Sequence, residues 1–215
     1  MAKYDQQWYS NFYGRYLGAF VMIVLVITNV IFYACQMIFG SALTYSGALI
    51  TDNVYNEGEW YRLLSATFLH ADISHLLSNM LGLFFLGGLV EISVGHLGFF
   101  FIYVLSGVGG NALSMLYENI ANIDRYSLGA SGGVYGLVGA ILVLSINERI
   151  KAQKEGRPAG NLLYRGLFVV VFMVLAGLSE QGINNSAHIG GLVIGIIVCS
   201  IIVLLLGKRV KAMDI

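Results

Sequence analysis

The chain has 215 residues, of which 57% are hydrophobic and only 11% are charged, and its formal net charge at pH 7 is zero. So few charged residues could not cover the surface of a water-soluble domain, so the composition indicates a membrane protein. A neutral chain without a basic stretch interleaved with aromatic residues also argues against nucleic acid as a partner.

Six apolar runs follow one another along the chain, and each is close to the ~20 residues that cross a hydrocarbon core. They cover about residues 17–39, 73–90, 97–117, 127–146, 166–180 and 186–206, and the fifth run is short. The first run is too long for a signal peptide and no cleavage site follows it, so we expect it to stay as a helix. The sequence therefore predicts one all-α domain over residues 1–215, a polytopic bundle of six transmembrane helices.

The segment between the first two runs, residues 40–69, mixes charged residues with many large apolar ones. It is too apolar for a free linker, so we expect a structured outer loop that partly enters the membrane interface. Both cysteines, Cys35 and Cys199, fall inside apolar runs and are predicted to be free thiols that serve packing only.

The basic residues predict the orientation of the bundle. With six spans both termini share one side, and ten of the 12 Lys and Arg residues fall on that side, whereas only Arg62 and Arg125 fall on the other. Cytoplasmic segments of membrane proteins carry an excess of Lys and Arg, so both termini are expected to be cytoplasmic. The second, fourth and sixth helices then enter the membrane from outside.

Four polar side chains lie early in these three inward-running helices, and therefore at a similar depth. They are His75 and Asn79 in the second helix, Ser131 in the fourth and His188 in the sixth. Polar residues inside a membrane are costly and indicate function. If Ser131 and His188 meet, they form a minimal pair of nucleophile and general base.

Glycines surround both members of this pair. Gly129, Gly132 and Gly136 flank Ser131, and Gly191 and Gly195 follow His188. The four-residue spacing gives each helix a face of small residues on which two backbones can approach closely, bringing Ser131 to His188. A serine in a glycine-rich membrane helix is often only packed there, and no strand is expected before it, so this motif alone leaves both interpretations open.

His75 and Asn79 are four residues apart and so share one helical face. Both can donate hydrogen bonds, and together with the backbone N–H of Ser131 they could form an oxyanion hole. The alternative is a hydrogen-bonded pair that ties this helix to a neighbour.

Three separated motifs together resemble those of the rhomboid family of intramembrane serine proteases, over most of the chain from Glu59 to Gly195. The motifs are His70-Ala-Asp-Ile-Ser-His75-Leu-Leu-Ser-Asn79, Gly129-Ala130-Ser131-Gly132 with Tyr135 beyond it, and Ala187-His188-Ile-Gly-Gly191 continuing to Gly195. The resemblance implies that Ser131 is the nucleophile, His188 the base, and His75 with Asn79 the oxyanion-hole donors.

By the same resemblance Tyr135 packs against the ring of His188, whereas His70, at the entry to the second helix, is expected to be a structural residue. No Asp or Glu lies in the outer half of the second, fourth or sixth helix in a position to orient His188, which agrees with catalysis by two residues. One departure is Tyr61, which stands before Arg62 where the family usually has tryptophan.

The function implied is an intramembrane serine endopeptidase that cleaves transmembrane client proteins through an acyl-enzyme. One alternative is a rhomboid-like protein that binds clients without cutting them, and a less favoured one is a small transporter. Zinc or aspartyl proteases are disfavoured, because the sequence has neither a His-Glu-x-x-His helix nor paired intramembrane aspartates. No metal or cofactor is implied, membrane lipids surround the bundle, and the oligomeric state is open. The compact form resembles the bacterial members, so a bacterial inner membrane with the site opening to the outer side is expected.

Overall fold

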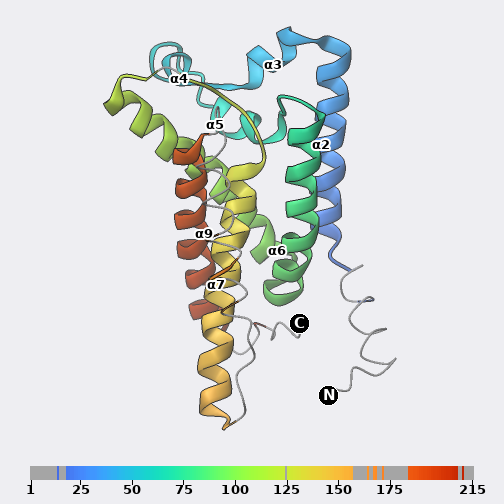
Figure 1. Cartoon of the computed structure of the whole chain (residues 1–215), viewed down its shortest axis with the longest axis vertical. Coiled ribbons are helices and arrows are strands. Elements are labelled where there is room, and N and C mark those ends of the chain that lie inside the picture. The colour runs from blue at the N-terminus through green and yellow to red at the C-terminus, as the bar shows by residue number, and fades with distance from the viewer. Residues whose placement is uncertain are drawn as a thin grey trace.

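Most of the described structure is helical, and four helices are long and apolar enough to cross a membrane. The computed structural model describes residues 14, 18–123, 125–156, 164, 167–168, 171, 184–207 and 210. The four helices are α2 (Phe20–Phe39), α6 (Ile73–Ala121), α7 (Ser131–Lys154) and α9 (Asn185–Leu206). The chain is therefore a multi-pass membrane protein (Figure 1).

Helix α6 has 49 residues and is interrupted at Gly95, whose φ of 80° and ψ of 169° are not helical. A helix of this length would be more than twice the thickness of a hydrocarbon core if it were straight. Instead, the chain turns back at Gly95. Gly87 precedes the break and Phe99 follows it, yet a Cβ on Gly87 would lie only 3.2 Å from the ring of Phe99. Figure 1 shows the two limbs, residues 73–94 and 96–121, joined at one end of the bundle. They correspond to the second and third predicted spans.

Three other predicted spans, 17–39, 127–146 and 186–206, correspond to α2, α7 and α9 with shifted ends. The largest shift is at α7, which continues to Lys154 as a charged helix end with Lys151 and Lys154 in its last turn. Most of the predicted span at 166–180 lies outside the described residues. The count of six spans is therefore not confirmed, because the described residues supply four such helices, one of which folds back on itself.

Helices α6, α7 and α9 pack on one another, and α2 packs against α6 on the outside of the bundle (Figure 1). Glycines set the closest contact, between α7 and α9. A Cβ on Gly191 would overlap the carbonyl oxygen of Gly132, and a Cβ on Gly195 would overlap that of Gly136. The two predicted faces of small residues therefore lie against each other, and the backbones touch directly.

The segment between α2 and α6 is folded, in agreement with the predicted structured loop. It contains α3 (Ser41–Gly47), β1 (Leu49–Ile50), α4 (Thr51–Glu57), α5 (Arg62–Ser65) and the 3-10 helix η1 (Ala66–Phe68). Strand β1 pairs antiparallel with β2 (Tyr126–Ser127), with Leu49 opposite Ser127. The all-α prediction did not include this pair, and the expectation that no strand precedes Ser131 was wrong. The strands form because two distant segments meet, which leaves no periodic pattern in either of them.

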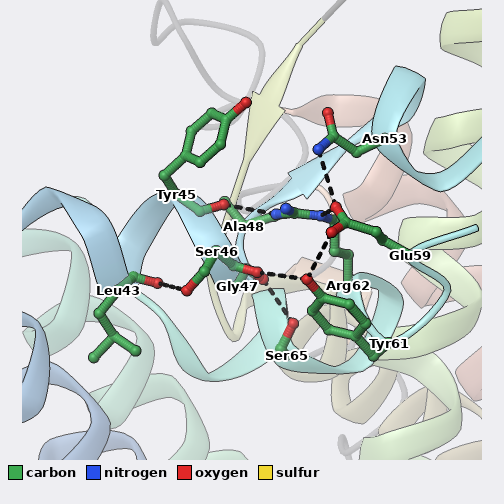
Figure 2. A network of polar contacts seen from close by, with 10 residues as sticks. All are labelled: Leu43, Tyr45, Ser46, Gly47, Ala48, Asn53, Glu59, Tyr61, Arg62 and Ser65. Carbon is green, nitrogen blue, oxygen red and sulfur yellow. Dashed lines mark hydrogen bonds and ion pairs between the residues drawn. The ribbon is translucent and has the colours of Figure 1, made fainter. Parts of the chain in front are cut away.

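Arg62 holds this loop together from within (Figure 2). Its buried guanidinium donates to the carbonyls of Tyr45 at 2.6 Å and Ala48 at 2.7 Å, and it pairs with Glu59 at 2.6 Å. The hydroxyl of Tyr61 donates to the carbonyl of Ser46 at 3.1 Å. Hydrogen bonds from Asn53 and from Arg62 hold the pKa of Glu59 below its usual range. Tyr61 therefore takes part in the loop's hydrogen bonds through a hydroxyl that tryptophan lacks.

A buried carboxylate, that of Glu91, lies at the opposite end of the bundle. Glu91 accepts hydrogen bonds from the backbone N–H of Val21 at 3.0 Å and of Met22 at 2.7 Å, and its other neighbour is the ring of His96. These N–H groups are in the first turn of α2, where the helix itself offers them no carbonyl acceptor. Glu91 therefore fixes the start of α2 against α6, far from the polar residues described next.

Candidate active site

Ser131 and His188 lie side by side where α7 and α9 begin. Ser131 is the first residue of α7, and His188 is in the first turn of α9. Their side chains meet at 2.8 Å, between Oγ of Ser131 and Nε2 of His188. Two residues 57 positions apart are thus within hydrogen-bonding distance, as the predicted glycine contact requires.

Tyr135 holds the ring of His188 in place. It lies one turn after Ser131 on α7, and the two rings stack with centroids 4.2 Å apart and an interplanar angle of 14°. The imidazole is 9% exposed, and among the described residues its Nδ1 atom has no hydrogen-bond partner. Within the part of the chain that the structure describes, stacking on Tyr135 and not a carboxylate therefore sets the plane of this ring.

His75 faces the serine from α6. Its backbone N–H donates a hydrogen bond of 2.8 Å to the carboxylate of Asp72, the N-cap of α6, which fixes the first turn of the helix. A Cβ on Gly129 would lie 2.9 Å from Nε2 of His75 and 3.7 Å from Oγ of Ser131. The φ of Gly129 is 140°, a backbone angle that residues with a Cβ rarely adopt. Gly129 thus keeps the space between the histidine and the serine open.

Asn79 lies one turn further along the same face of α6. It is buried, and its Nδ2 atom has no hydrogen-bond partner within the described part of the chain. A buried amide without a partner costs free energy, so this nitrogen is a donor available to an added acceptor such as a water molecule or a substrate atom.

His70 supports His75 from behind. The His70 side chain is 1% exposed, and its ring meets that of His75 edge to face at 5.2 Å. Burial, and to a lesser degree the charge of His75, lowers the pKa of His70 to about 4. The side chain of Gln36 on α2 pairs with the backbone N–H of His70 at 2.9 Å and with its carbonyl at 3.1 Å. His70 is therefore a neutral packing residue of the site's wall.

A buried polar cluster beside the start of α9 was missed by the sequence analysis. The carboxylate of Glu118, near the end of α6, accepts from Thr51 at 2.6 Å, from Ser114 at 2.9 Å and from the amide of Asn184 at 3.1 Å. Glu118 is on the second limb of α6, which the sequence predicts to run outward, so it is not among the polar residues expected early in the three inward-running helices. Two signals could have found it: an acid four residues after a serine in an apolar run, and an asparagine four residues before His188 at a helix start.

These residues define a class of protein: a multi-pass helical membrane protein with a serine and a histidine paired at the start of two tightly packed helices. Among the described residues, no group of three or more His, Cys, Asp or Glu could hold a metal ion.

Comparison with known proteins names the family. A model of the rhomboid domain matches residues 57–205, more than half of the chain, and the chain belongs to the rhomboid family.

Its relatives include plant and bacterial proteins. RHOMBOID-like protein 2 of Arabidopsis thaliana is 39% identical over 72% of this chain and 46% of its own length. Rhomboid protease AarA of Providencia stuartii is 29% identical over 85% of this chain and 72% of its own length. Rhomboid protease GluP of Bacillus subtilis strain 168 is 33% identical over 65% of this chain and 25% of its own length. The chain thus spans about half or less of the length of the plant relatives that it matches. Because plants and bacteria both appear, the expected bacterial origin stays a prediction.

Proposed function

We propose that the chain is an intramembrane serine endopeptidase, with Ser131 as the nucleophile and His188 as the general base and acid. The observation that carries this proposal is the 2.8 Å contact between Oγ of Ser131 and Nε2 of His188. A hydroxyl is a weak nucleophile by itself, and an adjacent imidazole activates it by taking its proton. Two relatives that are named rhomboid proteases support the same reaction class.

In the first step, Oγ of Ser131 attacks the carbonyl carbon of the scissile peptide bond and its proton moves to Nε2 of His188. The ring must then carry its own proton on Nδ1, so that Nε2 is free to accept. The stack on Tyr135 keeps the ring nearly parallel to that side chain and aims Nε2 at the serine.

The attack turns the carbonyl oxygen into an oxyanion, and we assign its binding to His75, Asn79 and the backbone N–H of Ser131. Because Ser131 is the first residue of α7, its N–H has no acceptor within the helix and points out of the helix start. The unpartnered Nδ2 of Asn79 and the nearby ring of His75 supply two further donors. Preorganised donors of this kind each lower the barrier by about 3 kcal/mol.

The tetrahedral intermediate then collapses: the C–N bond breaks, His188 gives its proton to the leaving amine, and an ester joins the client to Ser131. A water molecule hydrolyses the ester in the second half, with His188 again taking and returning the proton. Water must therefore reach the site, and we propose that it enters from the outer side, where the three helices begin. The clients would be other membrane proteins cut in or beside a transmembrane segment.

The test is covalent labelling of the detergent-solubilised protein with a fluorophosphonate, which reacts only with an activated serine. Wild-type protein should be labelled, Ser131→Ala should not be labelled, and His188→Ala should react about 10²-fold or more slowly. Heat-denatured wild-type protein serves as the blank, because it keeps every hydroxyl of the chain but loses the contact between the serine and the histidine.

Equal labelling of wild type, Ser131→Ala and His188→Ala would contradict the proposed pair. The same assay separates the endopeptidase from a relative that binds clients without cutting them. A binding protein would retain a single-span client in pull-down experiments but would show no labelling that depends on Ser131. The two proposals therefore predict different results for one reagent.

A further inference from the structure

We propose that Glu118 is a positioning residue for His188, and that it acts through the side-chain amide of Asn184 at the start of α9. This inference rests on the proposed function, because it assigns a role in placing the general base. It concerns the polar cluster of Thr51, Ser114, Glu118, Ser127, Asn184 and Ser186, which we call the α9 anchor.

Asn184 is the N-cap of α9. Its Oδ1 atom accepts a hydrogen bond from the backbone N–H of Ala187 at 3.1 Å, and its carbonyl accepts one from the N–H of His188 at 3.2 Å. Both bonds are in the turn that carries the imidazole. The conformation of Asn184 therefore fixes the position of the His188 backbone, and with it the position of the imidazole relative to Ser131.

An asparagine side chain can cap a helix only when its oxygen faces the helix, and an amide can rotate by half a turn. Glu118 specifies the rotation. Its carboxylate is fully buried and accepts from Nδ2 of Asn184 at 3.1 Å. Because this oxygen of Glu118 is the acceptor, the NH₂ end of the amide faces Glu118 and the amide oxygen is left to cap α9.

The other members of the α9 anchor hold the carboxylate and the amide in place. Thr51 donates to Oε2 of Glu118 at 2.6 Å, which links the outer loop to the anchor. The amide of Asn184 also donates to Oγ of Ser127 at 2.7 Å, on the strand that precedes Ser131. The anchor therefore joins the loop, α6, the segment before Ser131 and the start of α9 at one point.

The test exchanges the acid and the amide. Asn184→Asp alone places two carboxylates against each other, which is unfavourable. Glu118→Gln alone removes the acceptor that selects the amide rotation. The double variant restores a pair of one acid and one amide, in which the carboxylate of residue 184 caps α9 and the amide of residue 118 donates to it.

The measurement is the rate constant and the amplitude of fluorophosphonate labelling, well below the melting temperature of every variant. A folding defect lowers the amplitude, whereas a misplaced base lowers the rate constant at full amplitude. We expect a loss of rate of roughly tenfold for Asn184→Asp and about fivefold for Glu118→Gln, with the double variant within about threefold of wild type.

The matched control is Glu91→Gln, which removes a buried carboxylate that caps α2 at the other end of the bundle. Its labelling rate should equal that of wild type. If Asn184→Asp does not reach full amplitude, Asn184→Ala replaces it, with an expected loss of rate of about fivefold and no new charge.

Wild-type rates for Glu118→Gln and for the Asn184 variants, or a double variant slower than either single one, would overturn the positioning role. Failure of the proposed function looks different, since wild-type protein would then show no labelling that depends on Ser131.

Discussion

Asn79 is the side chain whose surroundings most directly suggest a ligand. Its buried Nδ2 atom has no described partner, so truncation to alanine removes a group that is unsatisfied in the free protein. We predict that Asn79→Ala lowers kcat for cleavage of a single-span client by about 10²-fold, leaves KM nearly unchanged and does not lower the melting temperature.

The control for this variant is Leu77→Ala, which truncates a 55% exposed side chain on the same helix and should leave kcat unchanged. A wild-type kcat for Asn79→Ala would contradict the proposal that this amide binds the oxyanion. A large loss of melting temperature would instead indicate the alternative interpretation, a hydrogen bond that ties α6 to a neighbour.

His70 makes stability depend on pH. Its pKa falls from an ordinary 6.5 to about 4 on folding, chiefly because the ring is buried. Between these two values the unfolded chain binds a proton that the folded protein does not, so stability falls as the pH falls from 6.5 towards 4. The contribution lost by pH 5 is about 2 kcal/mol.

We therefore predict that the melting temperature falls further between pH 7 and pH 5 for the wild-type protein than for His70→Gln. Melting temperatures at the two pH values, measured by tryptophan fluorescence in detergent, are enough to check this. Parallel pH dependence in the two proteins would mean that His70 is not the group that titrates.

At the scale of the helices, the contact between α7 and α9 depends on Gly191. Replacing glycine by alanine inside a helix is ordinarily stabilising by about 1 kcal/mol. At Gly191 the added Cβ would overlap the carbonyl of Gly132, next to Ser131, so the two backbones must separate. We predict that Gly191→Ala destabilises the protein by about 1–3 kcal/mol and lowers the labelling rate.

Melting temperature and labelling rate check this prediction together. Ile197→Ala is the control, because it changes a 49% exposed side chain on the same helix. If Gly191→Ala melted at or above the wild-type temperature, the backbones would not be held in contact by this glycine.

For the whole molecule, the sequence predicts the parts that the membrane dictates. A lipid bilayer requires long apolar helices, so the apolar runs in the sequence predict α2, α7 and α9. The contact between Ser131 and His188 is also predictable, because helices that enter from one side place their early residues at one level.

The parts that the sequence did not predict are contacts between distant segments. The pairing of Leu49 with Ser127 and the hydrogen bond between Glu118 and Asn184 join segments with no shared period. Each depends on the helices already being packed, since the partners face each other only in the folded bundle.

The orientation of the whole molecule in the membrane is the last property that can be tested directly. We predict that the loop before α6 faces outward and the end of α7 faces the cytoplasm, because the topology expected from the sequence puts most Lys and Arg residues on the latter side. In a Cys35→Ala, Cys199→Ala background, Asn56→Cys should react with a membrane-impermeant maleimide in intact cells. Lys154→Cys should react only after the membrane is permeabilised.

Both added cysteines replace exposed residues, and the cysteine-free background should remain unlabelled. The reverse pattern would place Ser131 and His188 near the cytoplasmic surface, because they lie at the same end of the bundle as the loop that carries Asn56 (Figure 1). Clients would then be cut on the cytoplasmic side, and the positive charges would face outward against the usual bias. The labelling pattern therefore decides from which side water and clients reach the serine.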